Sequence, residues 1–353
     1  MNRYDERYEI RMAKDMDIEN IMQFIDKYWK KGHIMSCDRE YFEYEFKEKN
    51  TVNFIIAIDK STGNIEAILG FLKSSHTQGK VDIWGSIWKV NDSHHNEPLL
   101  GIELQKRVDK LAGCRYHNGI GINPHTALPL MRMFFRRNVG KMNQYYMLNE
   151  NLKEYRIAQI NQKIVKEINQ EEALILIPIN SFEELINRYS IGEHNKKAIP
   201  YKDEWYVQKK FFSNPRRKYM VYGIVKSLTD KKIKGFIVLR ECSYQGSSVL
   251  RILDYYGKQE NFGRIGGALH DMILANHYEY VDLYTLGFEE KYIQQAGFVK
   301  REENSVNIIP NYFEPFEKKN IDIYVQYENE NTVFFKADGD QDRCNYYEVT
   351  VDE

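Results

Sequence analysis

Hydrophobic and polar positions follow the same order in two stretches of the chain that lie about 165 residues apart. Each stretch alternates as a β-hairpin and a third strand, then changes to helical spacing before a further strand and a last helix. The first stretch comprises Asn53–Ile58, Ile65–Leu72, Val81–Val90, Leu99–Leu111 and Gly119–Asn123. The second comprises Tyr219–Val225, Ile233–Arg240, Ser248–Tyr256, Ile265–Ala275 and Tyr280–Tyr284. A repeated supersecondary unit predicts two domains of one fold.

The segments around the repeat complete each unit. An alternating strand at Tyr8–Met12 and helices at Asp15–Trp29 and Asp38–Phe46 precede the first hairpin. We expect three further strands, of which the first closes domain one and the other two form a terminal hairpin: Met142–Leu148, Ile321–Tyr327 and Thr332–Lys336. The predicted domains are residues 1–155 and 173–353, joined by a polar bridge at 156–172.

Length and composition agree with this organisation. At 353 residues with 42% hydrophobic content, the chain can bury two cores. A formal net charge of −1 argues against a nucleic-acid or anionic-membrane surface. The N-terminus is charged and no apolar run approaches the ~20 residues of a membrane span. The four cysteines have neither metal-ligand nor disulfide-framework spacing. We therefore expect a cytoplasmic protein without a metal.

The predicted element order, β-α-α-β-β-β-α-β-α-β, resembles the GNAT acyltransferase fold. The local signals are Trp29–Ile34, Pro98–Gly101, Gly119–Asn123, Gly140–Tyr146 and Phe334–Arg343. The chain looks like the tandem GNAT-fold proteins of bacterial surface-glycan biosynthesis, and the resemblance covers nearly all of it. It implies an α/β (α+β) fold class with two GNAT-like domains, each a mixed central sheet flanked by helices. It also implies acyl-CoA, with acetyl-CoA as the first choice, as co-substrate.

In this family, the CoA pyrophosphate binds backbone N–H groups of a glycine-rich loop at a helix N-terminus. The loop of the second unit is a degenerate match, with glycines for close backbone approach and basic side chains for phosphate charge. Its candidate cofactor residues are Lys258, Gly263, Arg264, Gly266 and Gly267. The alternative is that these glycines permit close helix packing. The first unit has Asp92, Glu97 and Pro98 at the equivalent turn, which weakens the case for CoA there.

The resemblance also implies an acid and a base. Strict alternation places Asp254 on one strand face with Leu250, Ile252 and Tyr256, an apolar setting that raises a carboxyl pKa and suits a base. Tyr292 falls near the position of the family's closing tyrosine and is the candidate acid. A strand-end aspartate bonded to a loop and a packed tyrosine are the respective alternatives. The first unit has Met131 where that tyrosine would fall.

The candidate acceptor-binding residues come from three places. His33 lies in the loop between the first two helices, where the family covers the acceptor, although a hydrogen-bonded structural histidine is the alternative. Trp84 and Trp88 lie four apart on a strand, hence on one face, and form either a sugar-stacking surface or core. The C-terminal candidates are Lys336, Asp338, Asp340, Asp342 and Arg343. A solvated acidic tail is their alternative, and the calcium-loop pattern fails at its sixth and twelfth positions.

These observations favour an N-acyltransferase that moves an acyl group from acyl-CoA to the amine of a sugar or sugar nucleotide. A Fem-type ligase that uses aminoacyl-tRNA is a rival, but it would require a basic groove and a helical arm that the sequence does not show. A non-catalytic binding or scaffold protein is the third possibility, supported by the degenerate loops and by Met131. The acyl group, the sugar and the oligomeric state stay open.

Overall fold

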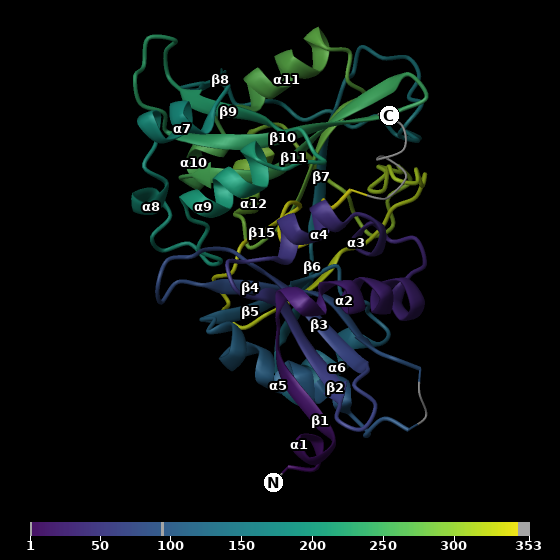
Figure 1. Cartoon of the computed structure of the whole chain (residues 1–353). Helices are drawn as coiled ribbons and strands as arrows, with labels where there is room; N and C mark the ends of the chain where they lie inside the picture. Colours follow the sequence, from purple (N-terminus) through teal and green to yellow (C-terminus); the bar gives the residue numbers. More distant parts are fainter. Residues whose placement is uncertain (1, 93–94, 345–353) are drawn as a thin grey trace.

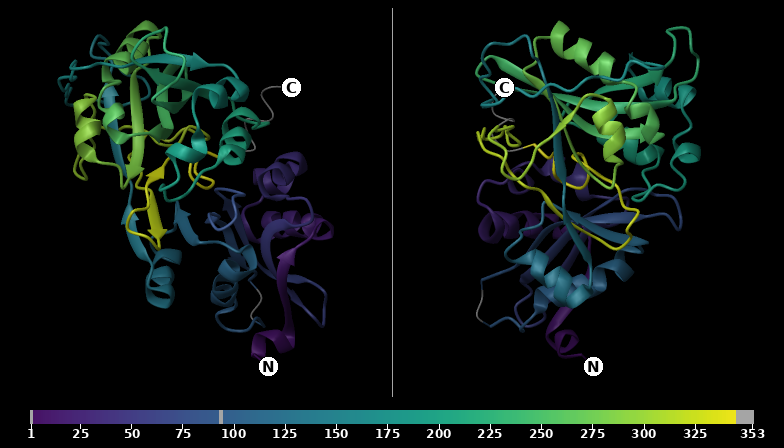
Figure 2. Two further views of the ribbon diagram at one scale, coloured as in Figure 1. Left: turned by 90° about the vertical axis from the view of Figure 1, so that its left-hand side faces the viewer. Right: turned by 180° about the vertical axis from the view of Figure 1, so that it is seen from behind.

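The structure of the protein is a computed structural model that describes residues 2–92 and 95–344. Two mixed sheets with helices packed on them form two lobes, and the C-terminal segment lies between the lobes (Figures 1 and 2). This architecture confirms the predicted α/β class with two mixed sheets. The bridge at 156–172 contains no helix or strand, apart from a single bridge between Gln159 and Ile308.

The first sheet has the strand order β1-β2-β3-β4-β5-β14-β6. Its strands are β1 (Tyr8–Ala13), β2 (Val52–Asp59), β3 (Ile65–Lys73), β4 (Asp82–Val90), β5 (Tyr116–Ile120), β14 (Tyr324–Tyr327) and β6 (Asn138–Lys141). β4 and β5 pair in parallel, and every other neighbouring pair is antiparallel. The helices of this half are α1 (Arg3–Arg7), α2 (Ile18–Phe24), α3 (Ile34–Cys37), α4 (Arg39–Phe46), α5 (Leu100–Ala112) and α6 (Ala127–Phe135).

The second sheet repeats this pattern in the order β13-β7-β12-β11-β10-β9-β8. Its strands are β13 (Val299–Lys300), β7 (Asn143–Leu148), β12 (Tyr280–Leu286), β11 (Ser247–Gly257), β10 (Gly235–Tyr244), β9 (Met220–Val225) and β8 (Ile175–Ile179), with β15 (Phe334–Phe335) on β12. The helices here are α7 (Phe182–Arg188), α8 (Ile191–His194), α9 (Glu204–Val207), α10 (Gln259–Phe262), α11 (Gly266–Ala275) and α12 (Glu290–Gln295).

The two halves exchange a strand. β7, which was expected to close the first domain, lies between β13 and β12 of the second sheet. In return, β14 lies between β5 and β6 of the first sheet. The expected terminal hairpin is therefore wrong, because β14 and β15 belong to different sheets. Alternating hydrophobic residues predict a strand but not the sheet edge that it joins.

A continuous core joins the lobes. The largest cluster of buried side chains includes Phe54 and Trp84 from the first half and Tyr206 and Phe236 from the second. The Trp84 and Tyr206 rings lie with centroids 5.6 Å apart. A second cluster, which includes Leu104 and Val108, packs α5 on the opposite face of the first sheet. Burial of large aromatic side chains between the sheets stabilises the placement of one lobe on the other.

Both central strands carry a β-bulge. Leu69 pairs with Trp88 and Phe71 with Gly85, so β4 has one extra residue in this interval. Leu239 pairs with Ile252 and Val238 with Asp254, which places the extra residue of β11 at Leu253. A bulge reverses the faces of the residues that follow it and bends the strand. These two bulges determine where several of the candidate residues point.

Candidate functional site

The parallel pairing of β4 and β5 stops halfway along β4. The ladder runs from Asp82 opposite Tyr116 to Gly85 opposite Gly119. β4 then continues through its bulge to Val90, whereas β5 ends at Ile120. Within the described residues, the backbone groups of Ser86–Val90 that face β5 therefore have no strand partner. A gap of this kind offers N–H and C=O groups to an extended ligand.

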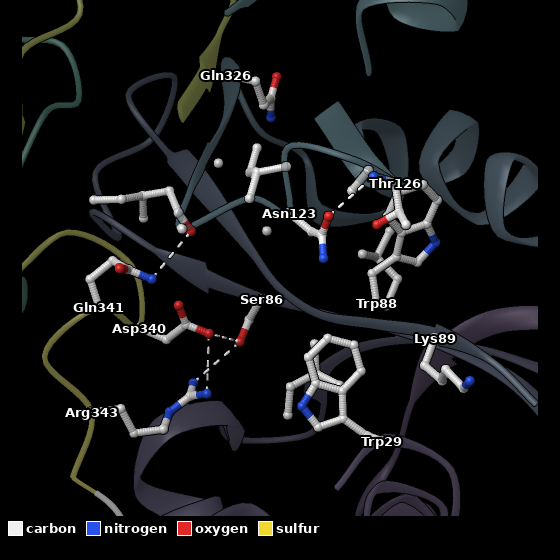
Figure 3. Close-up of a pocket in the computed structure, with 18 of the residues that line it drawn as sticks. Trp29, Ser86, Trp88, Lys89, Asn123, Thr126, Gln326, Asp340, Gln341 and Arg343 are labelled. Atoms are coloured by element: carbon white, nitrogen blue, oxygen red, sulfur yellow. Dashed lines mark hydrogen bonds and ion pairs between the residues drawn. The ribbon is translucent and has the colours of Figure 1, made fainter. Parts of the chain in front are cut away.

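A cavity of about 960 Å³ opens at this gap. The first half contributes β4, the end of β5 and the loop after it, and the beginnings of α5 and α6. The second half contributes residues from five of its segments, of which the last provides Lys336 and Asp340–Cys344. Figure 3 shows Trp88, Asn123 and Thr126 on one side of the cavity and the C-terminal residues Asp340, Gln341 and Arg343 on the other.

The N-terminus of α5 lies at the cavity wall. Leu99 precedes this 13-residue helix in the left-handed conformation, with φ 64° and ψ 22°. Non-glycine residues seldom adopt this conformation, and such strain is often found at functional sites. A side chain at Gly101 would meet Trp88 Nε1 at 3.1 Å. The first N–H groups of a helix have no partner within it, so they favour an anion at this end.

Charged groups flank that helix end. Lys89 lines the cavity and bonds Asp92 at 2.8 Å. Glu97 also lines it, and Arg3 and Arg7 lie 3.9 Å from its carboxylate oxygens. These two arginines partly neutralise a carboxylate that would otherwise repel an anion. The acidic residues of this turn, which the sequence analysis gave as evidence against CoA in the first unit, are therefore a weaker objection in the folded protein.

Trp29 and His33 also line the cavity. Trp29 is 46% exposed, which is unusual for a tryptophan. Burial and the cation of Arg343 lower the pKa of His33 to about 4, so its ring is neutral at pH 7. His33 Nδ1 accepts the Met35 N–H at 3.2 Å, which leaves the ring proton on Nε2 as a donor. His33 can therefore orient an acceptor but is not suited to take its proton.

Ser86, at the bulge of β4, joins the two halves of the site. Its hydroxyl donates to Asp340 Oδ2 at 2.7 Å, and Arg343 Nη1 lies 3.2 Å from the same carboxylate oxygen (Figure 3). Arg343 also pairs with the buried Glu45 at 2.8 Å. The C-terminal segment is thus fixed to β4 and to α4, and it completes the cavity.

His117 was not among the residues that the sequence indicated. It lies on β5 with its side chain 2% exposed, and its Nδ1 is 2.8 Å from Asp109 Oδ1 on α5. The Nε2 atom points toward Gly85, where the β4–β5 ladder ends, 3.2 Å from the place that a Cβ would occupy. A carboxylate on Nδ1 sets the ring so that Nε2 can accept a proton. A helix aspartate and a strand histidine eight residues apart form no recognisable local motif.

The equivalent gap in the second sheet is filled. β15 pairs with β12 at Thr285–Phe335 and Leu286–Phe334, and Ala337 N–H donates to Leu253 C=O at 2.9 Å. The C-terminal segment thus occupies the space between β11 and β12. The large cavity lies in the first sheet and not in the second.

Asp254 contributes to the packing between β11 and the C-terminal segment. Strict alternation predicted that Asp254 shares a strand face with Leu250 and Ile252. The bulge at Leu253 makes this prediction wrong, because it turns Asp254 to the other face. Asp254 bonds Lys202 Nζ at 2.7 Å, and Lys202 lies 2.6 Å from Asp338. All three side chains are buried. This geometry is that of a structural ion-pair network.

The candidate cofactor residues of the second unit lie away from the cavity. A Cβ at Gly266 would meet Ala296 C=O at 2.3 Å, and one at Gly263 would meet Gln295 Oε1 at 2.7 Å. Close packing against the backbone of Ala296 therefore requires Gly266, which agrees with the packing alternative for this loop, whereas Gly263 faces the end of the Gln295 side chain. Arg264 pairs with Glu172, whereas Lys258 is exposed beside Glu260. Gly267 and Tyr292 also lie outside the cavity lining, Tyr292 being packed on the core of the second half.

The bulge in β4 also separates the two tryptophans. Trp84 is fully buried between the lobes, whereas Trp88 faces α5 and donates from Nε1 to Gly101 C=O at 3.1 Å. The expectation that they share a face is therefore wrong. Among the predicted acceptor-binding residues, six line the cavity and two, Trp84 and Asp338, do not. The six are His33, Trp88, Lys336, Asp340, Asp342 and Arg343.

Residues 2–92 and 95–344 contain neither a candidate membrane span nor a candidate metal-binding cluster. No helix in these ranges is long and apolar enough to cross a membrane. Within the same ranges no three His, Cys, Asp or Glu side chains form a group that could hold a metal ion.

Comparison with known proteins bears on the fold. No family model matches the sequence, and no curated protein is significantly similar to it. A GCN5-related N-acetyltransferase from Anabaena variabilis is 12% identical with a TM-score of 0.52, and the match covers 90% of this chain and 72% of that one. A probable N-acyltransferase from Enterococcus faecalis is 7% identical with a TM-score of 0.54, over 92% and 73% of the two chains.

A third solved structure contains a GCN5-related glucosamine N-acetyltransferase region of a fungal multi-domain β-N-acetylglucosaminidase. It is 8% identical with a TM-score of 0.50, and the match covers 91% of this chain and 38% of that one. Identities this low carry information about architecture alone. The chain therefore has the GNAT fold, built as two mixed α/β units whose sheets exchange a strand.

Proposed function

We propose that this protein transfers an acyl group from acyl-CoA to an amine held in the cavity of the first sheet. One observation carries the proposal: the open edge of β4 and the N-terminus of α5 line the same cavity. An extended pantetheine can pair with that edge, and a pyrophosphate can bind the N–H groups of the helix end. The second sheet has the matching elements, but β15 occupies the gap.

The residues present fit acyl-CoA. Backbone groups of Ser86–Val90 would hold the pantetheine, and the first turn of α5, with Lys89 nearby, would hold the phosphates. Bound acyl-CoA supplies the activated acyl group. Trp88, whose indole bonds Gly101 C=O, fixes the first turn of α5 against β4.

Two groups near the start of the gap could take the proton of an acceptor ammonium. His117 is oriented by Asp109, and Asp340 bonds Ser86 at the bulge. Tyr312 lines the cavity from the second half, and burial raises its pKa, which keeps its hydroxyl protonated at neutral pH. It could therefore donate a proton to the leaving thiolate in place of the tyrosine that Met131 replaces.

The finer proposal is that the acceptor is the amine of a sugar or sugar nucleotide, as expected for surface-glycan biosynthesis. Support comes from the exposed ring of Trp29 and from the polar groups of His33 and Asp340 in one wall of the cavity. Aromatic faces stack on sugar rings, and carboxylates and imidazoles bond hydroxyls. The glucosamine N-acetyltransferase region of the fungal neighbour shares the fold and suggests the first acceptor to test.

A binding protein without activity is the second candidate. It is favoured by Glu97 near the expected phosphate position and by the strained Leu99 in place of a glycine. The two functions are distinguished by release of CoA thiol from acetyl-CoA in the presence of amino sugars. Transfer predicts thiol release that needs the amine and falls about 10²-fold or more in His117→Gln or Asp340→Asn. Acetyl-CoA binding without turnover on any amine would favour the second candidate.

A further inference from the structure

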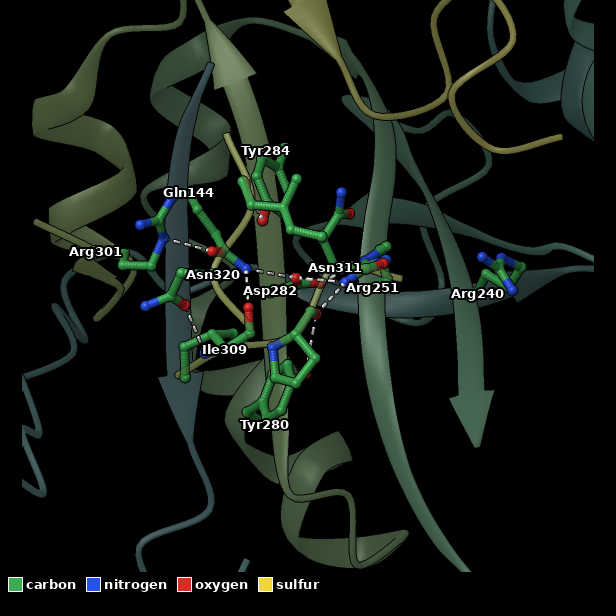
Figure 4. A network of polar contacts seen from close by, with 12 residues as sticks. Gln144, Arg240, Arg251, Tyr280, Asp282, Tyr284, Arg301, Ile309, Asn311 and Asn320 are labelled. Atoms are coloured by element: carbon green, nitrogen blue, oxygen red, sulfur yellow. Dashed lines mark hydrogen bonds and ion pairs between the residues drawn. The ribbon is translucent and has the colours of Figure 1, made fainter. Parts of the chain in front are cut away.

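One end of the cavity is built by side chains of the second half. It is lined by Arg217, Arg240, Arg251, Asn311, Lys336 and Asp342. Figure 4 shows Arg251 beside Asn311, with Arg240 on the neighbouring strand. These side chains come from five separate segments of the chain, and none takes part in the transfer step described above.

The arginines of this region are already paired. Arg251 makes two bonds of 2.8 Å to Asp282 and a third, of 2.7 Å, to Asn311 C=O. Arg240 bonds Asp342 Oδ1 at 2.8 Å. The third, Arg217, pairs with Glu314. Three carboxylates thus neutralise three guanidinium groups before any ligand binds.

Lys336 has no such partner. Only 2% of this residue is exposed, and its amine makes no hydrogen bond or ion pair with the residues that the structure describes. Two rings lie about 6 Å from it, Tyr312 at 5.9 Å and Tyr284 at 6.0 Å. A buried cation without a hydrogen-bond acceptor destabilises a fold, so its retention points to a ligand.

Asn311 is a second unsatisfied group in the same wall. It is 2% exposed, and both polar atoms of its carboxamide lack partners within the described part of the chain. Arg240 Nε is buried and unpartnered in the same way. Two acceptor atoms of the same wall, Asn311 Oδ1 and Asp342 Oδ2, also lack partners in the described part of the chain. Most buried polar side chains are hydrogen-bonded, so unsatisfied groups around one cavity form a site for a polar ligand, and the amine of Lys336 favours acceptor atoms of that ligand.

We propose that this end of the cavity binds an anionic group of the acyl acceptor, either a carboxylate or a phosphate. The inference rests on the proposed function, because it concerns the amine substrate of that site. Lys336 donates to one oxygen of the anion and Asn311 Nδ2 to another. The acceptor is then an amine with an acidic group at a distance from its nitrogen, and not a neutral amino sugar.

The binding is linked to pH. Burial and the cation of Arg251 lower the pKa of Lys336 to about 7. The charged and titratable groups around it are Arg240, Arg251, Tyr284, Asp282, Tyr312 and Asp342. An anion beside the amine favours its charged form, so binding at pH 7 to 8 takes up a proton. Affinity for the anion therefore falls as the pH rises above 7.

The test compares three amines of one ring type: glucosamine, glucosamine 6-phosphate and 2-amino-2-deoxyglucuronic acid. Binding to the full chain is measured by calorimetry without acyl-CoA, so the result does not depend on catalysis. We expect at least one anionic amine to bind about 10-fold or more tightly than glucosamine, and Lys336→Met to remove that advantage. Lys319→Met, which alters an exposed lysine paired with Glu317, is the matched control and should bind like wild type.

Calorimetry in two buffers of different ionisation enthalpy measures the number of protons taken up on binding. The amine and phosphate of the ligand exchange protons with both proteins, so the difference between them reports Lys336. We expect more proton uptake on binding of the anionic amine to wild type than to Lys336→Met. A response to the phosphate alone or to the carboxylate alone supports the subsite and identifies its ligand. Equal binding of all three amines, or anionic binding that survives Lys336→Met, overturns it. The proposal is also overturned if Lys336→Met lowers the affinity for CoA alone, because the cation would then bind the co-substrate and not the acceptor. Loss of transfer with anion binding intact would count against the proposed function only.

Discussion

Replacement of Lys202 by methionine should destabilise the protein through the network that fills the second sheet. Lys202 Nζ lies 2.7 Å from Asp254 and 2.6 Å from Asp338, whose side chains are 1% and 0% exposed. Removal of the cation leaves two carboxylates buried near each other without their partner. Breaking a buried ion pair in this way costs about 3–5 kcal/mol. For a chain of 353 residues that loss lowers Tm by about 4–7 °C.

The loss should depend on pH with a defined sign. Burial raises the pKa of Asp338 to about 6 in the wild type, above its value of 3.8 in the unfolded chain. A raised carboxyl pKa gives stability that is present at low pH and is lost as the pH rises through the folded-state value. Without Lys202, the folded protein can keep these side chains buried at low cost only when they are protonated. The deficit of Lys202→Met should therefore be larger at pH 8 than at pH 5.

Thermal unfolding of purified variants at pH 5 and pH 8 measures both effects. The triple variant Lys202→Met, Asp254→Asn, Asp338→Asn is the control, because it removes the charges together and should recover most of the lost stability. A Lys202→Met protein with wild-type Tm would contradict the structural role of the network. An Asp254→Asn protein with wild-type Tm and a large loss of kcat would restore Asp254 as the catalytic base.

Three further predictions concern the first sheet and its cavity. Since the folded-state pKa of Lys336 is about 7, below its ordinary value, wild-type stability should rise with pH from 7 to 10.5. Lys336→Met should be more stable than wild type below pH 7, by at most about 5 kcal/mol, in urea unfolding. Gly121→Ala would place its Cβ 1.9 Å from the Gln341 amide, so it should displace a side chain that lines the cavity and raise the acceptor KM. Gly113 has the same left-handed backbone conformation but no atom within 4 Å of the added Cβ, so Gly113→Ala should leave KM unchanged. His117→Gln should lower kcat about 10²-fold or more, with CoA binding unchanged in calorimetry.

The repeat could be read from the sequence because it rests on local patterns. Strand alternation and helical spacing recur in both halves, and they predicted the order of elements and the fold class. The β-bulges could not be read in this way. One extra residue in β4 and one in β11 leave the hydrophobic pattern intact but reverse the faces. That reversal buried Trp84 and turned Asp254 toward Lys202.

Long-range pairing explains the remaining differences. The partner of β7 and the partners of β14 and β15 depend on which sheet edges are open in the folded chain. The sequence indicated the C-terminal acidic stretch as one unit, yet Asp338 lies inside the core and Asp340 faces the cavity. The glycines of the second loop suggested phosphate binding, whereas contacts with the α12 region, far along the chain, account for Gly266.

The location of the acyl-CoA site is the central claim, and matched substitutions at the two helix starts test it most directly. Gly101 is the second residue of α5 and lines the cavity. Gly267 is the second residue of α11, where an added Cβ would meet only Gln170, at 3.5 Å, among the described residues. Acetyl-CoA binding is measured by calorimetry for Gly101→Asp and Gly267→Asp, with thermal unfolding to verify the fold of each. The account predicts that Gly101→Asp abolishes binding, because a carboxylate at this helix end repels the phosphates, and that Gly267→Asp binds like wild type. Binding retained in Gly101→Asp and lost in Gly267→Asp would place the co-substrate in the second sheet and contradict the account.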